Sequence, residues 1–132
     1  MVIYLIKKIN TKNAPEAKGQ YSQAVIAGDF IFLSGQLPIN PKTGKIIDGN
    51  IKEQTTQTIG NIREILATEN IGLDRIVKVS VYLKDLKDFI KMNQVYSKYF
   101  TAKPARETVQ AVIPLGAKLE ISCIAYIGDD KK

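Results

Sequence analysis

The sequence predicts an α+β fold in which two helices cover one face of a mixed β-sheet of about six strands. Two segments carry apolar residues at helical spacing, and the other apolar segments have the β-branched character of strands. The chain has 132 residues, 45% of them hydrophobic and 24% charged, which is typical of one globular domain. We therefore expect a single domain over residues 1–132, with 128–132 as a solvated tail.

The N-terminal half predicts three strands followed by a helix. Residues 2–9 are rich in β-branched side chains and predict the first strand. Residues 21–27 and 30–37 predict two more, and the Gly-Asp pair between them favours a tight hairpin, because glycine supplies the positive φ of such a turn. From 51 to 70, apolar residues recur every three or four positions, which predicts a helix.

The C-terminal half predicts a strand, a second helix and two last strands. Residues 76–83 alternate between apolar and polar side chains, as a half-buried strand does. An apolar stripe from 85 to about 100 predicts the second helix. Residues 106–113 and 119–127 predict the final strands, which are joined by a short turn containing proline and glycine.

Several of these strands are apolar on both sides, for example at Phe30 and Phe32 on one side and Ile31 and Leu33 on the other. Two helices cover only one face of a sheet, so the second face needs either loops or another copy of the chain. We expect an oligomer in which the sheets pack around a symmetry axis.

The composition excludes several kinds of site. The chain has no histidine, which excludes Ser-His-Asp and Cys-His nucleophilic sites and nearly every zinc hydrolase, and no metal site is expected. It has neither a Gly-rich phosphate loop nor a GxGxxG motif. Its single cysteine, Cys123, forms no internal disulfide, and no apolar run in the sequence reaches the ~20 residues of a membrane span. These features favour a cytoplasmic protein.

The net charge raises the question of a nucleic-acid partner. Nineteen Lys and Arg against 13 Asp and Glu give +6, which is compatible with an anionic partner. The lysines are scattered, however, with no run of three and no interleaved aromatic residues of the kind that RNA readers use. We interpret the excess as solubilising surface charge and expect no dedicated nucleic-acid site.

Two charged residues have unusual positions on apolar strands. Arg106 opens the strand 106–113, where Val109 and Ile113 occupy the other side and are expected to face the helices. Glu120 is likewise expected on the sheet face away from the helices, so both charges would share that face. An unpaired buried guanidinium costs several kcal/mol, so Arg106 needs an anion. That anion is either Glu120, within one chain or between subunits, or a bound ligand.

Three more polar positions interrupt apolar elements. Asn93 lies on the apolar stripe of the second predicted helix, where its amide needs either local backbone partners or a ligand. Ser34-Gly35 interrupts a strand, and such a glycine permits close approach of another backbone or a ligand. Tyr21 opens the hairpin, where an aromatic ring more often packs than reacts.

Short segments spread over essentially the whole chain resemble one known family. In chain order they include Tyr21-Ser22-Gln23-Ala24, Ser34-Gly35-Gln36-Leu37-Pro38, Asn93-Gln94-Val95-Tyr96, Pro104-Ala105-Arg106 and Leu119-Glu120-Ile121. This pattern is similar to the Rid (YjgF-type) family of reactive-intermediate deaminases. The resemblance implies a chorismate-mutase-like homotrimer with ligand clefts between subunits. It also implies hydrolysis of 2-imino acids and their enamine tautomers, such as 2-aminoacrylate, to 2-keto acids and ammonia, with no cofactor.

The resemblance also implies roles for individual residues. Arg106 would bind the substrate carboxylate, a role that suits its planar guanidinium. Glu120 would hold or activate the attacking water.

The remaining residues of the implied cleft are polar. Tyr21, Ser34 and Asn93 match positions that line it. Thr108 replaces a cysteine found in many relatives, and we expect it to shape the cleft. Two other functions stay open: a non-catalytic module that binds small carboxylates, and, with less support, an RNA-binding or ribonuclease protein.

Overall fold

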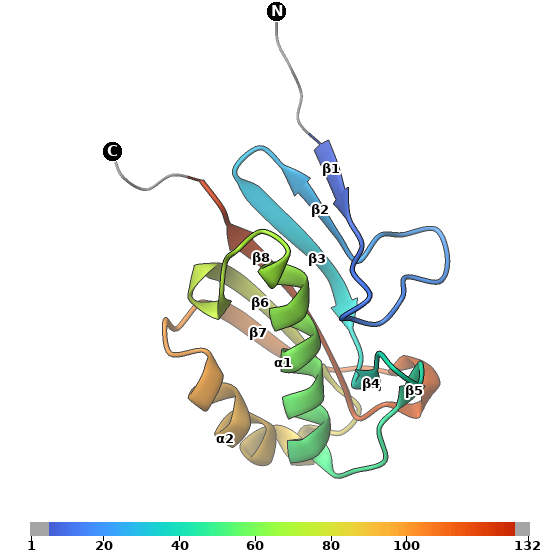
Figure 1. Cartoon of the computed structure of the whole chain (residues 1–132). Coiled ribbons are helices and arrows are strands. Elements are labelled where there is room, and N and C mark those ends of the chain that lie inside the picture. The colour runs from blue at the N-terminus through green and yellow to red at the C-terminus, as the bar shows by residue number, and fades with distance from the viewer. Residues whose placement is uncertain (1–5, 129–132) are drawn as a thin grey trace, which may run out of the picture.

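The computed structural model describes residues 6–128 and has one main sheet with two helices packed across one of its faces (Figure 1). The strands of this sheet are β1 (Ile6–Ile9), β2 (Ala24–Ala27), β3 (Phe30–Gln36), β6 (Ile76–Leu83), β7 (Ala105–Gln110) and β8 (Leu119–Tyr126). The helices are α1 (Ile51–Ala67) and α2 (Phe89–Tyr99), and a small hairpin of β4 (Ile39–Asn40) and β5 (Lys45–Ile46) precedes α1.

These elements confirm the predicted α+β class. The beginning of the first predicted strand, residues 2–5, and the tail residues 129–132 lie outside the described part of the chain. Short 3-10 helices connect the larger elements at Leu73–Arg75, Leu86–Asp88 and Pro114–Gly116. Within residues 6–128, no helix is both long enough and apolar enough to cross a membrane.

The main sheet has the order β1-β2-β3-β8-β6-β7 and is mixed, because β7 pairs parallel with β6 while all other pairs are antiparallel. The Gly-Asp hairpin is confirmed between β2 and β3, where Gly28 has φ 59°. The last two strands, which the proline-containing turn joins, do not pair with each other. The polypeptide passes through α2 between β6 and β7, so β7 lies at the edge and β6 separates it from β8.

The helix α1 begins at a capping box. The side chain of Asn50 accepts a hydrogen bond from the Glu53 backbone N–H at 2.9 Å, and the Glu53 carboxylate accepts one from the Asn50 N–H at 3.1 Å. Its apolar stripe, which includes Ile59, Ile62 and Leu66, is fully buried against the sheet. The stripe thereby fixes which sheet face the helices cover.

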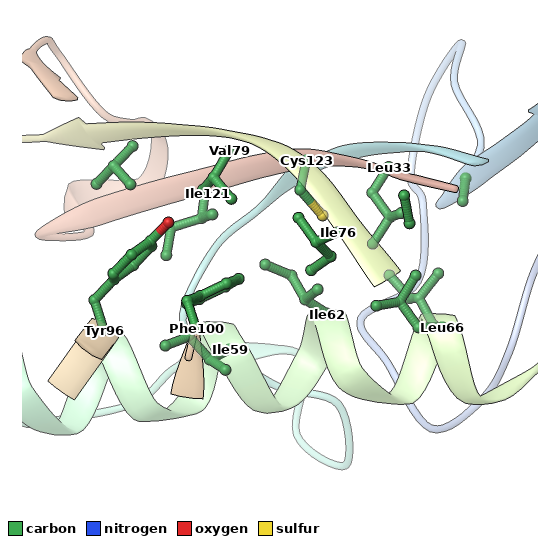
Figure 2. Close-up of a cluster of buried hydrophobic side chains, with 14 of the residues drawn as sticks. Leu33, Ile59, Ile62, Leu66, Ile76, Val79, Tyr96, Phe100, Ile121 and Cys123 are labelled. Carbon is green, nitrogen blue, oxygen red and sulfur yellow. The ribbon is translucent and has the colours of Figure 1, made fainter. Parts of the chain in front are cut away.

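The core fills the space between the helices and one sheet face. Figure 2 shows Ile62 and Leu66 of α1 and Tyr96 of α2 pointing toward strands that carry Val79 and Cys123. Cys123 lies on the helix-facing side, and burial raises the pKa of its thiol to about 12. The thiol is therefore protonated at neutral pH and does not act as a nucleophile.

The opposite sheet face is apolar and only partly covered. Phe30 is 40% exposed, and Phe32, Val77 and Val109 are each 44% exposed. Phe30 also meets Tyr126 of β8 edge to face, with ring centroids 5.4 Å apart. The two helices leave this second face open, as the apolar residues on both sides of the strands predicted.

Candidate active site

Arg106 lies on the edge strand β7, beneath α2. It is paired with Val79 of β6, which is fully buried against the helices, and neighbouring residues in register share a face of a sheet. The Arg106 side chain therefore points to the helix side, and the expectation that it points away was wrong. Alternation along β7 shows only that Arg106 and Val109 face opposite ways. The register with β6 decides which of them meets the helices.

The residues on one face of α2 contact this arginine. Phe89, Asn93 and Tyr96 follow at spacings of four and three, so they lie on one side of the helix. The Arg106 Nη1 donates a hydrogen bond to Asn93 Oδ1 at 2.7 Å. The guanidinium carbon lies 4.5 Å from the Tyr96 ring centroid and 5.5 Å from that of Phe89. The amide that stood out on the apolar stripe is thus satisfied by a side chain rather than by local backbone.

The Arg106 side chain lines a hollow of about 580 Å³ on this side of the molecule. The hollow is lined by Asn93, Tyr96, Ser97, Phe100, Thr101, Lys103, Pro104 and Arg106. Both charged residues in this set are positive, and no described carboxylate forms an ion pair with Arg106. A hollow with this lining attracts an anion and has hydrogen-bond donors to hold it.

Thr108 shares the face of Arg106, because it pairs with the buried Val81 of β6. Its hydroxyl oxygen is buried and has no hydrogen-bond partner in the described chain. The predicted cleft residue therefore lies near the arginine along the same strand, yet its polar atom is unused within one protomer.

Glu120 lies on the other face of the sheet. On β8 it lies between the fully buried Leu119 and Ile121, and it pairs with Tyr82 of β6, so its side chain points away from the helices as predicted. Its carboxylate occupies the space above Gly35, where a Cβ atom would come within 2.7 Å of the Glu120 Cδ. The close approach at this glycine is thus made by the side chain of Glu120, and not by another backbone or a ligand as expected.

A β-bulge prepares this contact. Leu33 of β3 pairs with Cys123 and Gln36 pairs with Ile121, so two residues of β3 stand opposite one residue of β8. The two bulged residues are Ser34 and Gly35. The Ser34 hydroxyl donates a hydrogen bond to the Ser22 carbonyl at 2.5 Å and ties the bulge to the segment that carries Tyr21.

Tyr21, Ser34, Gly35 and Glu120 line a second hollow of about 770 Å³. The other lining residues are Pro15, Glu16, Lys18, Leu37, Ile39, Pro41, Gly44, Pro114 and Leu115. Burial raises the pKa of the Glu120 carboxyl above its ordinary value, because a charged carboxylate is less stable out of water. No described cation forms an ion pair with it.

The predicted site residues thus form two groups on opposite sheet faces of one protomer. Arg106 of β7 pairs with Val79 of β6, and Glu120 of β8 pairs with Tyr82 on the other side of β6. The Cα atoms of Arg106 and Glu120 are therefore separated by two strand spacings and by three residues along the strands, which is roughly 14 Å. An ion pair between Arg106 and Glu120 within one chain is therefore excluded. The sequence analysis missed the rings of Phe89 and Tyr96 around Arg106. Their signal was the spacing from Asn93, which places all three on one side of α2.

Comparison with known proteins identifies the family. The profile of the family described as "Endoribonuclease L-PSP" matches residues 11–127. A RutC family protein of Pyrococcus horikoshii is 51% identical over 120 residues, which is 89% of this chain and 95% of that protein. The chain belongs to the Rid family, also called the YjgF or RutC family.

Two further Rid-family relatives bear on chemistry and fold. "Reactive Intermediate Deaminase A, chloroplastic" of Arabidopsis thaliana is 45% identical over 121 residues, covering 90% of this chain and 65% of that protein. The crystal structure of Escherichia coli TdcF with bound serine is 35% identical with a TM-score of 0.87, and covers 92% of this chain and 99% of that one. The chorismate-mutase-like fold implied by the sequence resemblance is therefore confirmed.

Proposed function

We propose that this Rid-family chain hydrolyses reactive 2-imino acids and their enamine tautomers, of the 2-aminoacrylate type, to 2-keto acids and ammonia. The observation that carries the proposal is Arg106, a guanidinium at a hollow without acidic lining residues and without a carboxylate partner in the described chain. A planar guanidinium binds a carboxylate through two parallel hydrogen bonds, and every proposed substrate has a carboxylate. The 45% identity to a Reactive Intermediate Deaminase A supports this reaction class.

The complete site forms between subunits of a homotrimer. A protomer carries the Arg106 group on one sheet face and the Glu120 group on the other, so one copy supplies the carboxylate clamp and its neighbour the water-holding carboxylate. The partly exposed Phe30, Phe32 and Val109 supply apolar area for such an assembly. Tyr21 and Ser34 then line the cleft from the Glu120 side. Asn93 lines it from the Arg106 side, and Thr108 lies on the same strand face as Arg106.

The chemistry needs little beyond positioning, because an imine carbon is already electrophilic. Arg106 fixes the carboxylate, and Glu120 accepts a proton from a water whose oxygen bonds to the imine carbon. Return of that proton to nitrogen gives a carbinolamine. Transfer of its hydroxyl proton to the nitrogen then accompanies cleavage of the C–N bond, which leaves a 2-keto acid and ammonia. Histidine, which the chain lacks, has no required step in this scheme.

The test generates the imine in place. An L-amino-acid oxidase with catalase produces 2-iminobutanoate, semicarbazide traps what remains, and the protein should lower the rate of trapping. Arg106→Ala should abolish this effect without changing the circular dichroism or the sedimentation mass. Arg63→Ala is the matched control, because Arg63 lies over Tyr99 and outside both hollows. Unchanged hydrolysis by Arg106→Ala would overturn the proposed role of the arginine.

The same protein samples also distinguish two alternative functions from imine hydrolysis. The solved relative with bound serine favours a module that binds small carboxylates without catalysis, for which binding would persist with no acceleration. The endoribonuclease named in the family description, together with the net charge of +6, favours an RNA-directed activity, which would require a salt-sensitive RNA complex. The expected cytoplasmic location stays a prediction.

A further inference from the structure

We propose that Tyr96 is the positioning residue for Arg106, and that its ring holds the guanidinium in the orientation that binds the carboxylate. This inference rests on the proposed function only for the identity of the ligand. The contact itself lies within one protomer, where the Arg106 Cζ is 4.5 Å from the Tyr96 ring centroid. A cation within about 6 Å of a ring centroid is attracted by the negative face of the ring.

Two contacts restrict the guanidinium together. Asn93 accepts one hydrogen bond from Nη1, and the ring of Tyr96 contacts the group independently of that bond. An arginine otherwise loses considerable rotamer freedom when it binds a ligand, which weakens binding. A guanidinium already held at two places loses less of that freedom, so it binds a carboxylate more tightly.

Tyr96 is itself held rigidly. It is 7% exposed, and its ring stacks on that of Phe100 with centroids 4.2 Å apart and an interplanar angle of 18°. Figure 2 shows Tyr96 pointing from α2 toward the sheet, with Phe100, the residue just after α2, also turned inward. The platform beneath the guanidinium therefore belongs to the packed core and is not a mobile surface ring.

The ring, and not the hydroxyl, carries this role. The Tyr96 hydroxyl oxygen is buried and has no hydrogen-bond partner in the described chain. Burial raises the pKa of the Tyr96 phenol, against the opposing effects of the Arg106 charge and of the approach of its guanidinium to the hydroxyl, so the side chain stays neutral at physiological pH. Phenylalanine at this position should therefore preserve the function of the residue.

The chain contains a matched control on the same helix. Tyr99 also belongs to α2 and also contacts an arginine, since Arg63 Cζ lies 5.1 Å from its ring centroid. Replacing either tyrosine with leucine removes the same atoms from the same helix. The two variants differ in which arginine loses its ring.

The first experiment observes the arginines directly. The chain has three arginines, Arg63, Arg75 and Arg106, so a ¹⁵N spectrum of the intact assembly resolves three Nε–Hε groups, assignable by single substitutions. Without ligand, Tyr96→Leu should remove the larger part of the ring-current shift of the Arg106 signal, since Phe89 lies farther away at 5.5 Å, and should increase the fast motion of the group. Tyr96→Phe should preserve both properties, and Tyr99→Leu should change the Arg63 signal alone.

The second experiment measures the consequence for ligand binding. Tyr96→Leu should weaken binding of 2-oxobutanoate about tenfold and raise KM by a similar factor, with kcat changed less. Tyr96→Phe and Tyr99→Leu should stay within about twofold of wild type. Tyr96→Met, which also lacks a ring, replaces the leucine variant if that one does not fold.

Two results overturn the inference. One is an unchanged Arg106 signal with unchanged affinity in the ringless variants, and the other is a loss in Tyr96→Phe as large as that in Tyr96→Leu. If wild type neither binds 2-oxobutanoate nor accelerates imine hydrolysis, the proposed function fails instead. The ligand-free Arg106 signal then still decides whether Tyr96 positions the guanidinium.

Discussion

The carboxylate of Glu120 lies over the backbone of Gly35, in the space that a side chain at position 35 would fill. The contact depends on the bulge in β3, which places a residue without Cβ opposite β8. The carboxylate that we propose to hold the water therefore lies directly against backbone atoms. Its location is therefore sensitive to a single methyl group.

Gly35→Ala should displace the Glu120 side chain and lower imine hydrolysis at least about tenfold, as misplacement of a reacting group by about 1 Å does. The loss of stability should be small, because the obstructing atoms belong to the end of a flexible side chain. Gly60→Ala is the control, since a Cβ there meets nothing within 4 Å and alanine favours the helix. Trapping kinetics and thermal unfolding measure both effects. Full activity in Gly35→Ala would contradict the proposed role of the contact.

The raised pKa of Glu120 predicts two pH dependences. As the base, Glu120 must be ionised, so activity should fall as pH drops through the raised pKa, and this limb should begin above the ordinary value of 4.5. Folded protein binds the proton more tightly than unfolded chain, so this group lowers stability as pH rises from 4.5 through the raised pKa.

Glu120→Gln therefore should be inactive yet slightly more stable than wild type at pH 7. The difference in unfolding temperature should vanish below the ordinary pKa, where the glutamate is neutral in both states. Calorimetric scans at several pH values measure it. A glutamine variant less stable than wild type at pH 7 would show that the ionised carboxylate has a stabilising partner.

Asn93→Asp should inactivate Arg106 without unfolding the protein. The substitution keeps the shape of the side chain that accepts the Nη1 hydrogen bond at 2.7 Å, but adds a negative charge next to the guanidinium. The new ion pair competes with the substrate carboxylate, so 2-oxobutanoate affinity should fall about tenfold or more. Gln94→Glu makes the same charge change at the neighbouring exposed position and should leave affinity within about twofold. Isothermal titration distinguishes the two, and equal losses would point to a general electrostatic effect.

Cys123→Ala should keep full activity, because the thiol lies among helix-facing core residues and its pKa is raised to about 12. Wild type should also resist alkylation by iodoacetamide at pH 8 until it unfolds, since almost no thiolate is present. Mass spectrometry counts the label. Rapid labelling of the folded assembly would show that the thiol is accessible.

Local patterns in the sequence predicted the elements well and their ends less well. The alternation in residues 76–83 gave β6 with its observed bounds. The strand predicted over 106–113 ends at Gln110, because Gln110 pairs with Leu83, where its partner strand stops. The strand predicted from Tyr21 begins at Ala24, since the side chain of Gln23 bonds to backbone groups of the preceding loop.

In the site, too, local sequence patterns predicted some features, and features that depend on segments distant in the sequence were not predicted. Side-chain type and position identified Arg106, Asn93, Glu120 and the Ser34-Gly35 pair. The prediction of the sheet face on which Arg106 lies was wrong, because that face depends on which strand lies beside β7. The neighbouring strand, β6, is more than 20 residues away along the chain. Tyr96 shares the side of α2 that carries Asn93, but its ring also fitted the apolar stripe, so nothing in the sequence showed that it faces the arginine.

Because the two halves of the proposed site lie on opposite faces of one sheet, damage to one half leaves the other intact. A chain carrying Arg106→Ala retains an unchanged Glu120, and a chain carrying Glu120→Gln retains an unchanged Arg106. If equal amounts of the two dead proteins are unfolded and refolded together, about a quarter of the clefts should join the two undamaged halves and regain turnover.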